Sequence, residues 1–300
     1  MTPAEGVPVT ANKQPSPLGV FDSGLGGLTV VRAILHSLPR EGMVYFGDTA
    51  RLPYGNKSEA TVTRLSLEAL RFLEHFGIKA LVVACNSASA VALDSLQAEA
   101  DVPVLGVVEA GARRAADVTR SGRIGVIGTR ATVDSDCYDR ALQELRTGVE
   151  VFSAACPLFV PLVEEGWIDD PVTRQVAEGY LAPLLENQVD TLILGCTHYP
   201  LLKALIGEVM GEEVTLIDSG EAVAVDVRAK LEDLGLQSSG QSASHRFFVS
   251  DQPQRFYAEG RRFLGETVLG SVQAVDQSDV PWYDRSSVEK HLGGETGRNS

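Results

Sequence analysis

Short apolar runs that alternate with amphipathic stretches constrain the fold of this chain more than any other feature of its sequence. The apolar runs cover Leu18–Phe21, Met43–Phe46, Ala80–Ala84, Val104–Val108, Arg123–Ile127, Val149–Phe152, Thr191–Leu194, Val214–Ile217 and Arg246–Val249. Helical periodicity is clear at Glu59–Phe76, which Gly77 closes, and at Pro171–Glu186. Buried strands that alternate with helices predict an α/β fold with parallel sheets and helices on both faces. Polar residues cluster after the strands, at the edge where such sheets bind ligands.

Two parts of this pattern repeat each other. The run LGVFDS at Leu18–Ser23 corresponds to IGVIGT at Ile124–Thr129, and LVVACNS at Leu81–Ser87 corresponds to LILGCTH at Leu192–His198. The second pair of segments carries a cysteine directly after each strand. We interpret this as an internal duplication, which predicts two similar α/β domains related by a pseudo-two-fold axis. One thiol would then lie on each side of a ligand bound in the cleft between the domains.

The composition suggests where these domains begin and end. The predicted division is a disordered tail at residues 1–17, a first domain at residues 18–110 and 218–283, a second domain at residues 111–217, and a disordered tail at residues 284–300. Both tails are polar, and the first is rich in Pro, Thr and Ser. Gln237–Ser244 is predicted to be a surface loop.

Charge and cysteine content narrow the functional classes. The formal net charge is −14, and the basic pairs Arg113–Arg114 and Arg261–Arg262 are isolated, so we expect no nucleic-acid partner. No apolar run reaches the roughly 18 residues of a membrane span, so we expect no membrane partner. The four cysteines are Cys85, Cys137, Cys156 and Cys196. No two of them have C-x-x-C spacing, and four scattered cysteines in a chain of 300 residues do not form a disulfide scaffold, so we expect free thiols in a reducing cytoplasm.

Cys85 and Cys196 are the strongest candidates for chemistry. Each follows an apolar run and precedes a polar pair, Asn-Ser or Thr-His. A helix N-terminus can lower the pKa of a thiol from about 8.5 into the range of about 3.5–7.5, so we expect activated thiols. Cys137 and Cys156 fit small buried hydrophobic residues, although Cys156 also follows a strand and could line the cleft.

Other polar residues leave alternatives open. His198 is either a structural histidine or a proton partner of Cys196. Cys196 and His198 could also bind a metal ion, but a structural site needs four ligands, so no metal is predicted. Asp22 and Ser23 either cap a helix or act in the site. The glycine-rich turn after them lacks the spacing and the lysine of a nucleotide-binding loop. Glu109 either faces solvent or holds a domain hinge.

Taken together, these motifs resemble the glutamate racemases of the aspartate/glutamate racemase family. The matching motifs are FDSGLGG at Phe21–Gly27, PYG at Pro53–Gly55, ACNSAS at Ala84–Ser89, GVVE at Gly106–Glu109, CPLFVPLVEEG at Cys156–Gly166 and GCTHYP at Gly195–Pro200. The resemblance runs from about Leu18 to at least Gly220. Ser87 stands where the family commonly has Thr, and Ala110 where it often has Pro.

The resemblance implies interconversion of L-glutamate and D-glutamate without pyridoxal phosphate, metal or any other cofactor, which supplies D-glutamate for peptidoglycan. One thiolate removes the α-proton and the other thiol returns one on the opposite face, with Cys85 and Cys196 each serving one enantiomer. Asp22 and His198 would assist the thiols, and Glu165, preferred to Glu164, would support His198. The implied substrate-binding residues are Asp22, Ser23, Pro53, Tyr54, Gly55, Asn86, Ser87, Thr129, Thr132, Thr197 and His198. A homodimer is a further expectation from the family.

Two alternatives remain open. A racemase of aspartate or another amino acid would use the same chemistry. A non-catalytic amino-acid-binding protein would bind its ligand without needing both thiols.

Overall fold

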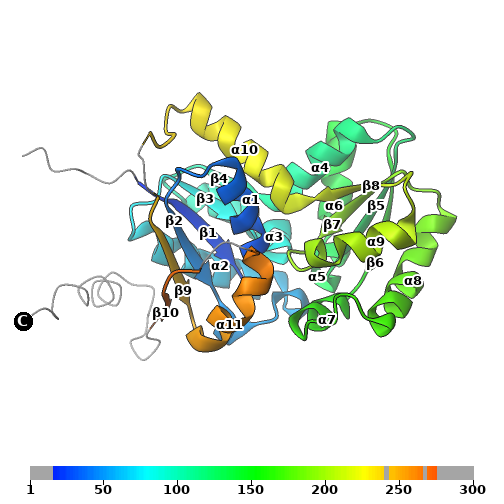
Figure 1. Cartoon of the computed structure of the whole chain (residues 1–300). Coiled ribbons are helices and arrows are strands. Elements are labelled where there is room, and N and C mark those ends of the chain that lie inside the picture. Colours follow the sequence, from blue (N-terminus) through cyan, green and yellow to red (C-terminus); the bar gives the residue numbers. More distant parts are fainter. Residues whose placement is uncertain (1–15, 240–242, 266–268, 276–300) are drawn as a thin grey trace, which may run out of the picture.

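Two parallel β-sheets form the centre of the computed structural model, which describes residues 16–239, 243–265 and 269–275 (Figure 1). The first sheet has the order β10-β9-β2-β1-β3-β4, the second has the order β6-β5-β7-β8, and all of their pairings are parallel. The strands are β1 (Leu18–Asp22), β2 (Met43–Gly47), β3 (Ala80–Val83), β4 (Val104–Gly106), β5 (Arg123–Gly128), β6 (Glu150–Ala155), β7 (Thr191–Gly195), β8 (Thr215–Asp218), β9 (His245–Val249) and β10 (Val272–Ala274). The predicted α/β fold with parallel sheets is confirmed.

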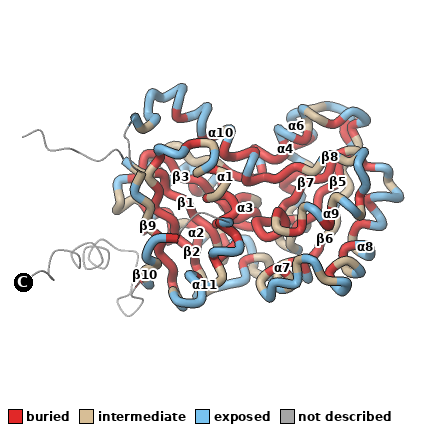
Figure 2. Tube along the Cα trace, in the orientation of Figure 1, coloured by how far each residue is buried: buried red, intermediate tan, exposed pale blue. Residues whose placement is uncertain are grey.

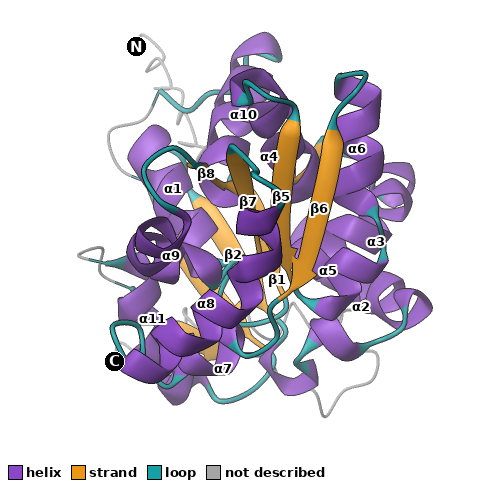
Figure 3. Cartoon of the chain, turned by 90° about the vertical axis from the view of Figure 1, so that its right-hand side faces the viewer, coloured by secondary structure: helices purple, strands orange, loops and turns teal. Residues whose placement is uncertain are grey.

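Helices cover both faces of the sheets. They are α1 (Leu28–Ser37), α2 (Glu59–Glu74), α3 (Asn86–Glu99), α4 (Val107–Val118), α5 (Arg130–Asp134), α6 (Cys137–Leu145), α7 (Phe159–Glu164), α8 (Pro171–Glu186), α9 (Lys203–Met210), α10 (Ser219–Asp233) and α11 (Pro253–Leu264), with 3-10 turns η1 (Thr49–Arg51), η2 (Tyr54–Asn56) and η3 (Tyr199–Leu202). Figure 3 shows α8 and α9 on one side of the second sheet and α6 on the other. Among the described helices, none combines the length and the apolar character that crossing a membrane requires.

Local sequence explains the boundaries of these elements. Ser58 accepts a hydrogen bond from the Thr61 N–H and caps α2, whose chain reverses at Gly77 with a φ of 61°. The central strands β1, β2 and β3 of the first sheet are buried (Figure 2). β1 is covered on both faces, because Val20 packs into one hydrophobic cluster and Phe21 into another. Continuous apolar runs are typical of strands covered on both faces.

The two halves share one topology. We call β1–β4 with their helices the first half and β5–β8 with theirs the second half. The order β2-β1-β3-β4 in the first half matches β6-β5-β7-β8 in the second. The register also matches, since Gly19 lies opposite Leu81 and Gly125 lies opposite Leu192. A Cβ on either glycine would lie within 3.5 Å of that leucine. Equivalent contacts at equivalent positions support the internal duplication.

The chain passes between the halves through helices rather than strands. Val107 and Val108, predicted to end a strand, begin α4 instead, so Glu109 lies in the first turn of that helix. A short apolar run does not distinguish a strand from a buried helix, and both valines are buried. α10 returns the chain and packs against both α1 and α4.

The predicted domain boundaries stay a prediction. The boundary after residue 110 falls inside α4, and the boundary after residue 217 falls one residue before the end of β8. The predicted disordered tails at residues 1–17 and 284–300 lie outside the described residues, except for residues 16 and 17. Residues 240–242 of the predicted loop lie outside them too.

Candidate active site

The first thiol lies where β3 meets α3. Cys85 is the N-cap of α3, and its thiol donates a hydrogen bond to Ser23 Oγ, which is 3.6 Å away. Burial of the thiol, together with the charge of Asp22, raises the pKa of Cys85 to about 12. The expectation of a lowered pKa was therefore wrong for this thiol, because burial outweighs the helix N-terminus. Cys85 keeps its proton at neutral pH, as a proton donor must.

Asp22 interacts electrostatically with the first thiol and with the histidine beside the second. Its Oδ2 accepts a hydrogen bond from the Gly24 N–H at 2.8 Å, while its Oδ1 is buried with no hydrogen-bond partner among the described residues. Burial raises the pKa of Asp22, and the Gly24 N–H and the charge of His198 oppose that effect. The Asp22 carboxylate thus interacts electrostatically with both Cys85 and His198. A buried acceptor without a partner is costly, so Oδ1 indicates a ligand-binding position.

The second thiol follows β7 and has a different proton partner. His198 Nδ1 lies 3.9 Å from Cys196 Sγ, and His198 Nε2 lies 3.1 Å from Glu164 Oε1. Burial by itself lowers the pKa of His198, but the hydrogen bonds to Cys196 and Glu164 outweigh burial and raise it to about 10. The ring is therefore protonated at neutral pH and can donate from both nitrogens. An imidazolium beside a thiol stabilises negative charge on the sulfur.

Glu164, and not Glu165, supports His198. Glu164 is the last residue of α7 and its carboxylate reaches the ring, whereas the side chain of Glu165 is exposed. Successive side chains of a helix point in different directions, and here the Glu164 carboxylate is the one that reaches His198. Arg262 of α11 donates hydrogen bonds to the carbonyls of Val163 and Glu164, at 3.1 and 2.7 Å. The sequence reasoning missed this role of Arg262 and treated the arginine pair only as an isolated basic pair.

Hydroxyl groups from both halves meet near the first thiol. Ser87 Oγ lies 2.9 Å from Thr129 Oγ1, which lies 3.1 Å from Thr132 Oγ1. Gly55 packs against Thr129 so closely that a Cβ on this glycine would lie 2.9 Å from Thr129 Cβ. The structure thus brings together four of the residues expected to bind substrate, two from each half.

Thr197 and His198 lie against the glycine-rich turn after β1. A Cβ on Gly26 would lie 2.2 Å from Thr197 Oγ1 and 2.6 Å from His198 Nδ1. Glycine is therefore needed at this position, where the first half meets the strand end that carries Cys196.

The remaining expected residues differ in what they can offer a ligand. Asn86 is buried, its Oδ1 accepts a hydrogen bond from Tyr138 at 2.7 Å, and its Nδ2 has no partner among the described residues. Tyr54 is buried and its hydroxyl donates to Asp48 Oδ2 at 2.6 Å, so that hydroxyl is engaged within the first half. Pro53 is exposed. The partners Asp48 and Tyr138 were not predicted as site residues. Asp48 directly follows β2, so its position after a strand could have revealed it, whereas no sequence pattern pointed to Tyr138.

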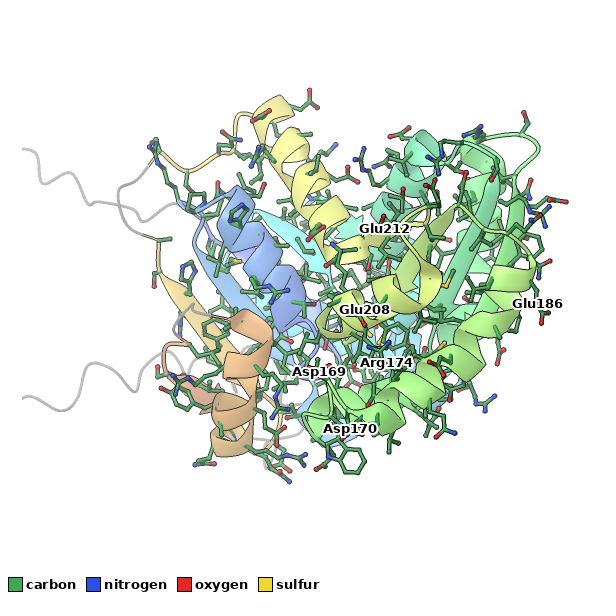
Figure 4. The ribbon with its side chains drawn as sticks, turned by 45° about the vertical axis from the view of Figure 1, so that its right-hand side comes forward. Asp169, Asp170, Arg174, Glu186, Glu208 and Glu212 are labelled. Atoms are coloured by element: carbon green, nitrogen blue, oxygen red, sulfur yellow. The ribbon has the colours of Figure 1, made fainter. Side chains whose placement is uncertain are left out.

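The labelled charged residues on and beside α8 and α9 are mostly acidic (Figure 4). Figure 4 labels charged residues on and beside α8 and α9, where Arg174 pairs with Glu208 among several carboxylates. Within the described ranges, no three His, Cys, Asp or Glu side chains are arranged to hold a metal ion. Metal-independent chemistry remains a prediction.

Comparisons with known proteins identify the family of the chain. The sequence model of the family Asp/Glu/Hydantoin racemase matches residues 20–227. The glutamate racemase of Geobacter metallireducens is 56% identical over 259 residues, which cover 86% of this chain and 96% of that protein. The crystal structure of a Bacillus anthracis glutamate racemase has a TM-score of 0.84 and 44% identity, covering 87% of this chain and 97% of that chain. A Francisella tularensis glutamate racemase, solved in complex with D-glutamate, has a TM-score of 0.82 and 36% identity. The match covers 88% of this chain and 98% of that chain. The chain therefore belongs to the Asp/Glu/hydantoin racemase family.

Proposed function

We propose that this chain interconverts L-glutamate and D-glutamate, with Cys85 and Cys196 as the two proton-transferring groups. The observation that carries the proposal is the pair of thiols at equivalent strand ends of a duplicated fold, each with its own proton partner. Cys85 lies beside Ser23 and Asp22, and Cys196 lies beside His198. The similar proteins named above support glutamate as the substrate, since the Francisella tularensis relative was solved with D-glutamate.

The reaction balances with the residues of the chain alone. For one enantiomer, the Cys196 thiolate takes the α-proton and becomes a thiol, while the electron pair stays on the substrate and spreads into its carboxylate. The Cys85 thiol then gives its proton to the opposite face of the α-carbon and becomes a thiolate. The other enantiomer reacts through the same steps in reverse. The protonated state of Cys85 and the imidazolium beside Cys196 suit the first direction.

Two buried polar atoms match the two charged groups on the α-carbon of an amino acid. Asn86 Nδ2 is a donor without a partner and suits a carboxylate, while Asp22 Oδ1 is an acceptor without a partner and suits an ammonium. The α-proton is weakly acidic, so preorganised donors must stabilise the charge that develops, at about 3–4 kcal/mol for each donor. We assign that task to Asn86 and to the hydroxyl cluster of Ser87, Thr129 and Thr132.

The cellular role, compartment and oligomeric state of the enzyme are also part of the proposal. Supply of D-glutamate for peptidoglycan follows from the family. The four cysteines are unpaired, which suits a reducing cytoplasm. A homodimer stays a prediction, which sedimentation of the purified chain would test.

The direct test is polarimetry of the purified chain with either enantiomer of glutamate, without added cofactor and with a metal chelator present. Interconversion of glutamate to an equal mixture is the expected result. Interconversion of aspartate or another amino acid alone would keep the mechanism and change the substrate. Binding of glutamate by calorimetry without any interconversion would favour the non-catalytic binding protein.

A further inference from the structure

One buried hydrogen bond joins the two halves beside the first thiol. Tyr138 lies on α6 of the second half, its side chain is buried, and its hydroxyl donates to Asn86 Oδ1 at 2.7 Å. Asn86 begins α3 in the first half, directly after Cys85. Burial raises the pKa of Tyr138 well above its usual value, so the hydroxyl stays protonated and able to donate.

In the structure this hydrogen bond engages the oxygen end of the Asn86 carboxamide. The oxygen and nitrogen of a carboxamide are nearly the same size, so rotation of the group exchanges an acceptor for a donor. With Oδ1 bound to Tyr138, Nδ2 is left as the buried donor without a partner among the described residues. The next residue, Ser87, forms a hydrogen bond with Thr129 of the second half, so both residues at the start of α3 contact the second half.

The same tyrosine ring also contacts the strand end that carries the second thiol. A Cβ on Gly195, directly before Cys196, would lie 3.1 Å from Tyr138 Cε2. A Cβ on Gly111 of α4 would lie 3.4 Å from the Tyr138 hydroxyl oxygen. One side chain thus touches the residue after Cys85, the residue before Cys196, and a helix that connects the halves.

We propose that Tyr138 is a positioning residue that holds the Asn86 carboxamide with Nδ2 toward the substrate carboxylate. The tyrosine acts on the reaction through Asn86 and transfers no proton itself. The proposal rests on the proposed function, because a glutamate-interconverting activity is what the positioning would serve.

A double-mutant cycle tests the proposal. Tyr138→Phe keeps the ring and removes only the hydroxyl, and it should lower kcat/KM for glutamate about tenfold, in line with loss of one hydrogen bond in a site. In an Asn86→Ala background the same change should have an effect of less than about twofold, because the group through which it acts is gone. Tyr199→Phe is the matched control, since Tyr199 is buried in the same half and donates to the carbonyls of Gly128 and Cys156 instead. Its effect should add to that of Asn86→Ala.

A second variant keeps the test decisive if Tyr138→Phe fails to fold. Asn86→Asp preserves an acceptor for Tyr138 and removes the donor, so it should lose at least as much kcat/KM as Asn86→Ala. Full additivity of Tyr138→Phe and Asn86→Ala would overturn the proposal, as would unchanged turnover in Asn86→Asp. Absence of glutamate interconversion in the unsubstituted chain would instead overturn the proposed function.

Discussion

Replacement of Glu164 by glutamine should narrow the pH range of activity on its alkaline side. The hydrogen bond between His198 Nε2 and Glu164 Oε1 is 3.1 Å long, and the two side chains are 10% and 27% exposed. A hydrogen bond to a charged group in such a setting contributes about 1.5–3 kcal/mol. One pH unit corresponds to about 1.4 kcal/mol, so the pKa of His198 should fall from its value of about 10 by about one to two pH units. The hydrogen bond to Cys196 remains and should prevent a complete return to the ordinary value.

The same change should affect stability in a defined pH window. The pKa of His198 is raised on folding, so the imidazolium contributes stability that is fully present below about pH 6.5 and is lost as the pH rises through about 10. In Glu164→Gln this contribution should be smaller and should be lost at a lower pH.

Two measurements on Glu164→Gln and the control Glu165→Gln check this reasoning. One is the pH profile of kcat/KM, and the other is an NMR titration of the His198 ring with labelled histidine. Glu165 is exposed and next in sequence, so its replacement should leave both titrations unchanged. Equal shifts in the two variants, or a shift only in Glu165→Gln, would refute the assignment of Glu164 as the partner of His198.

Two further substitutions test contacts around the second thiol. Gly26→Ala places a Cβ 2.2 Å from Thr197 Oγ1 and 2.6 Å from His198 Nδ1. Overpacking of this kind costs about 1–3 kcal/mol and should lower kcat/KM, measured by polarimetry, at least about fivefold. An unchanged kcat/KM would contradict the close approach. Arg262→Gln removes the donors to the carbonyls at the end of α7, and loss of these two hydrogen bonds, one part-buried and one exposed, should lower kcat about two- to fivefold. The same variant should change the alkylation rate of Cys196 but not of Cys85, and equal changes at both thiols would indicate a merely structural role.

Apolar runs followed by polar residues predicted most of the fold, because a polar residue after an apolar run marks the end of a buried strand. The repeat of Leu81–Ser87 at Leu192–His198 predicted that both thiols occupy equivalent places, and the register of β1 with β3 and of β5 with β7 agrees. Val107 and Val108 were wrongly predicted to lie in a strand, because either a strand or a helix can bury two adjacent valines. Periodicity over so few residues carries no information about that choice.

The site was less predictable, because its details depend on contacts between distant residues. The choice between Glu164 and Glu165 depends on how α7 is rotated toward His198, which adjacent identical residues cannot reveal. The pKa of Cys85 depends on burial and on Asp22, although its place at a helix N-terminus suggested the opposite direction. Tyr138 is 52 residues from Asn86 in sequence, and only the packing of α6 against α3 brings the two together.

Isotope exchange in single-cysteine variants tests the two-thiol mechanism most directly. Glutamate of one configuration would be incubated in D2O with the unsubstituted chain, Cys85→Ser or Cys196→Ser, and each enantiomer analysed for deuterium on the α-carbon. The mechanism predicts that the unsubstituted chain forms the opposite enantiomer with deuterium on its α-carbon, and that neither variant interconverts the enantiomers. Interconversion at an undiminished rate in either variant would contradict the assignment of one thiol to each face of the substrate.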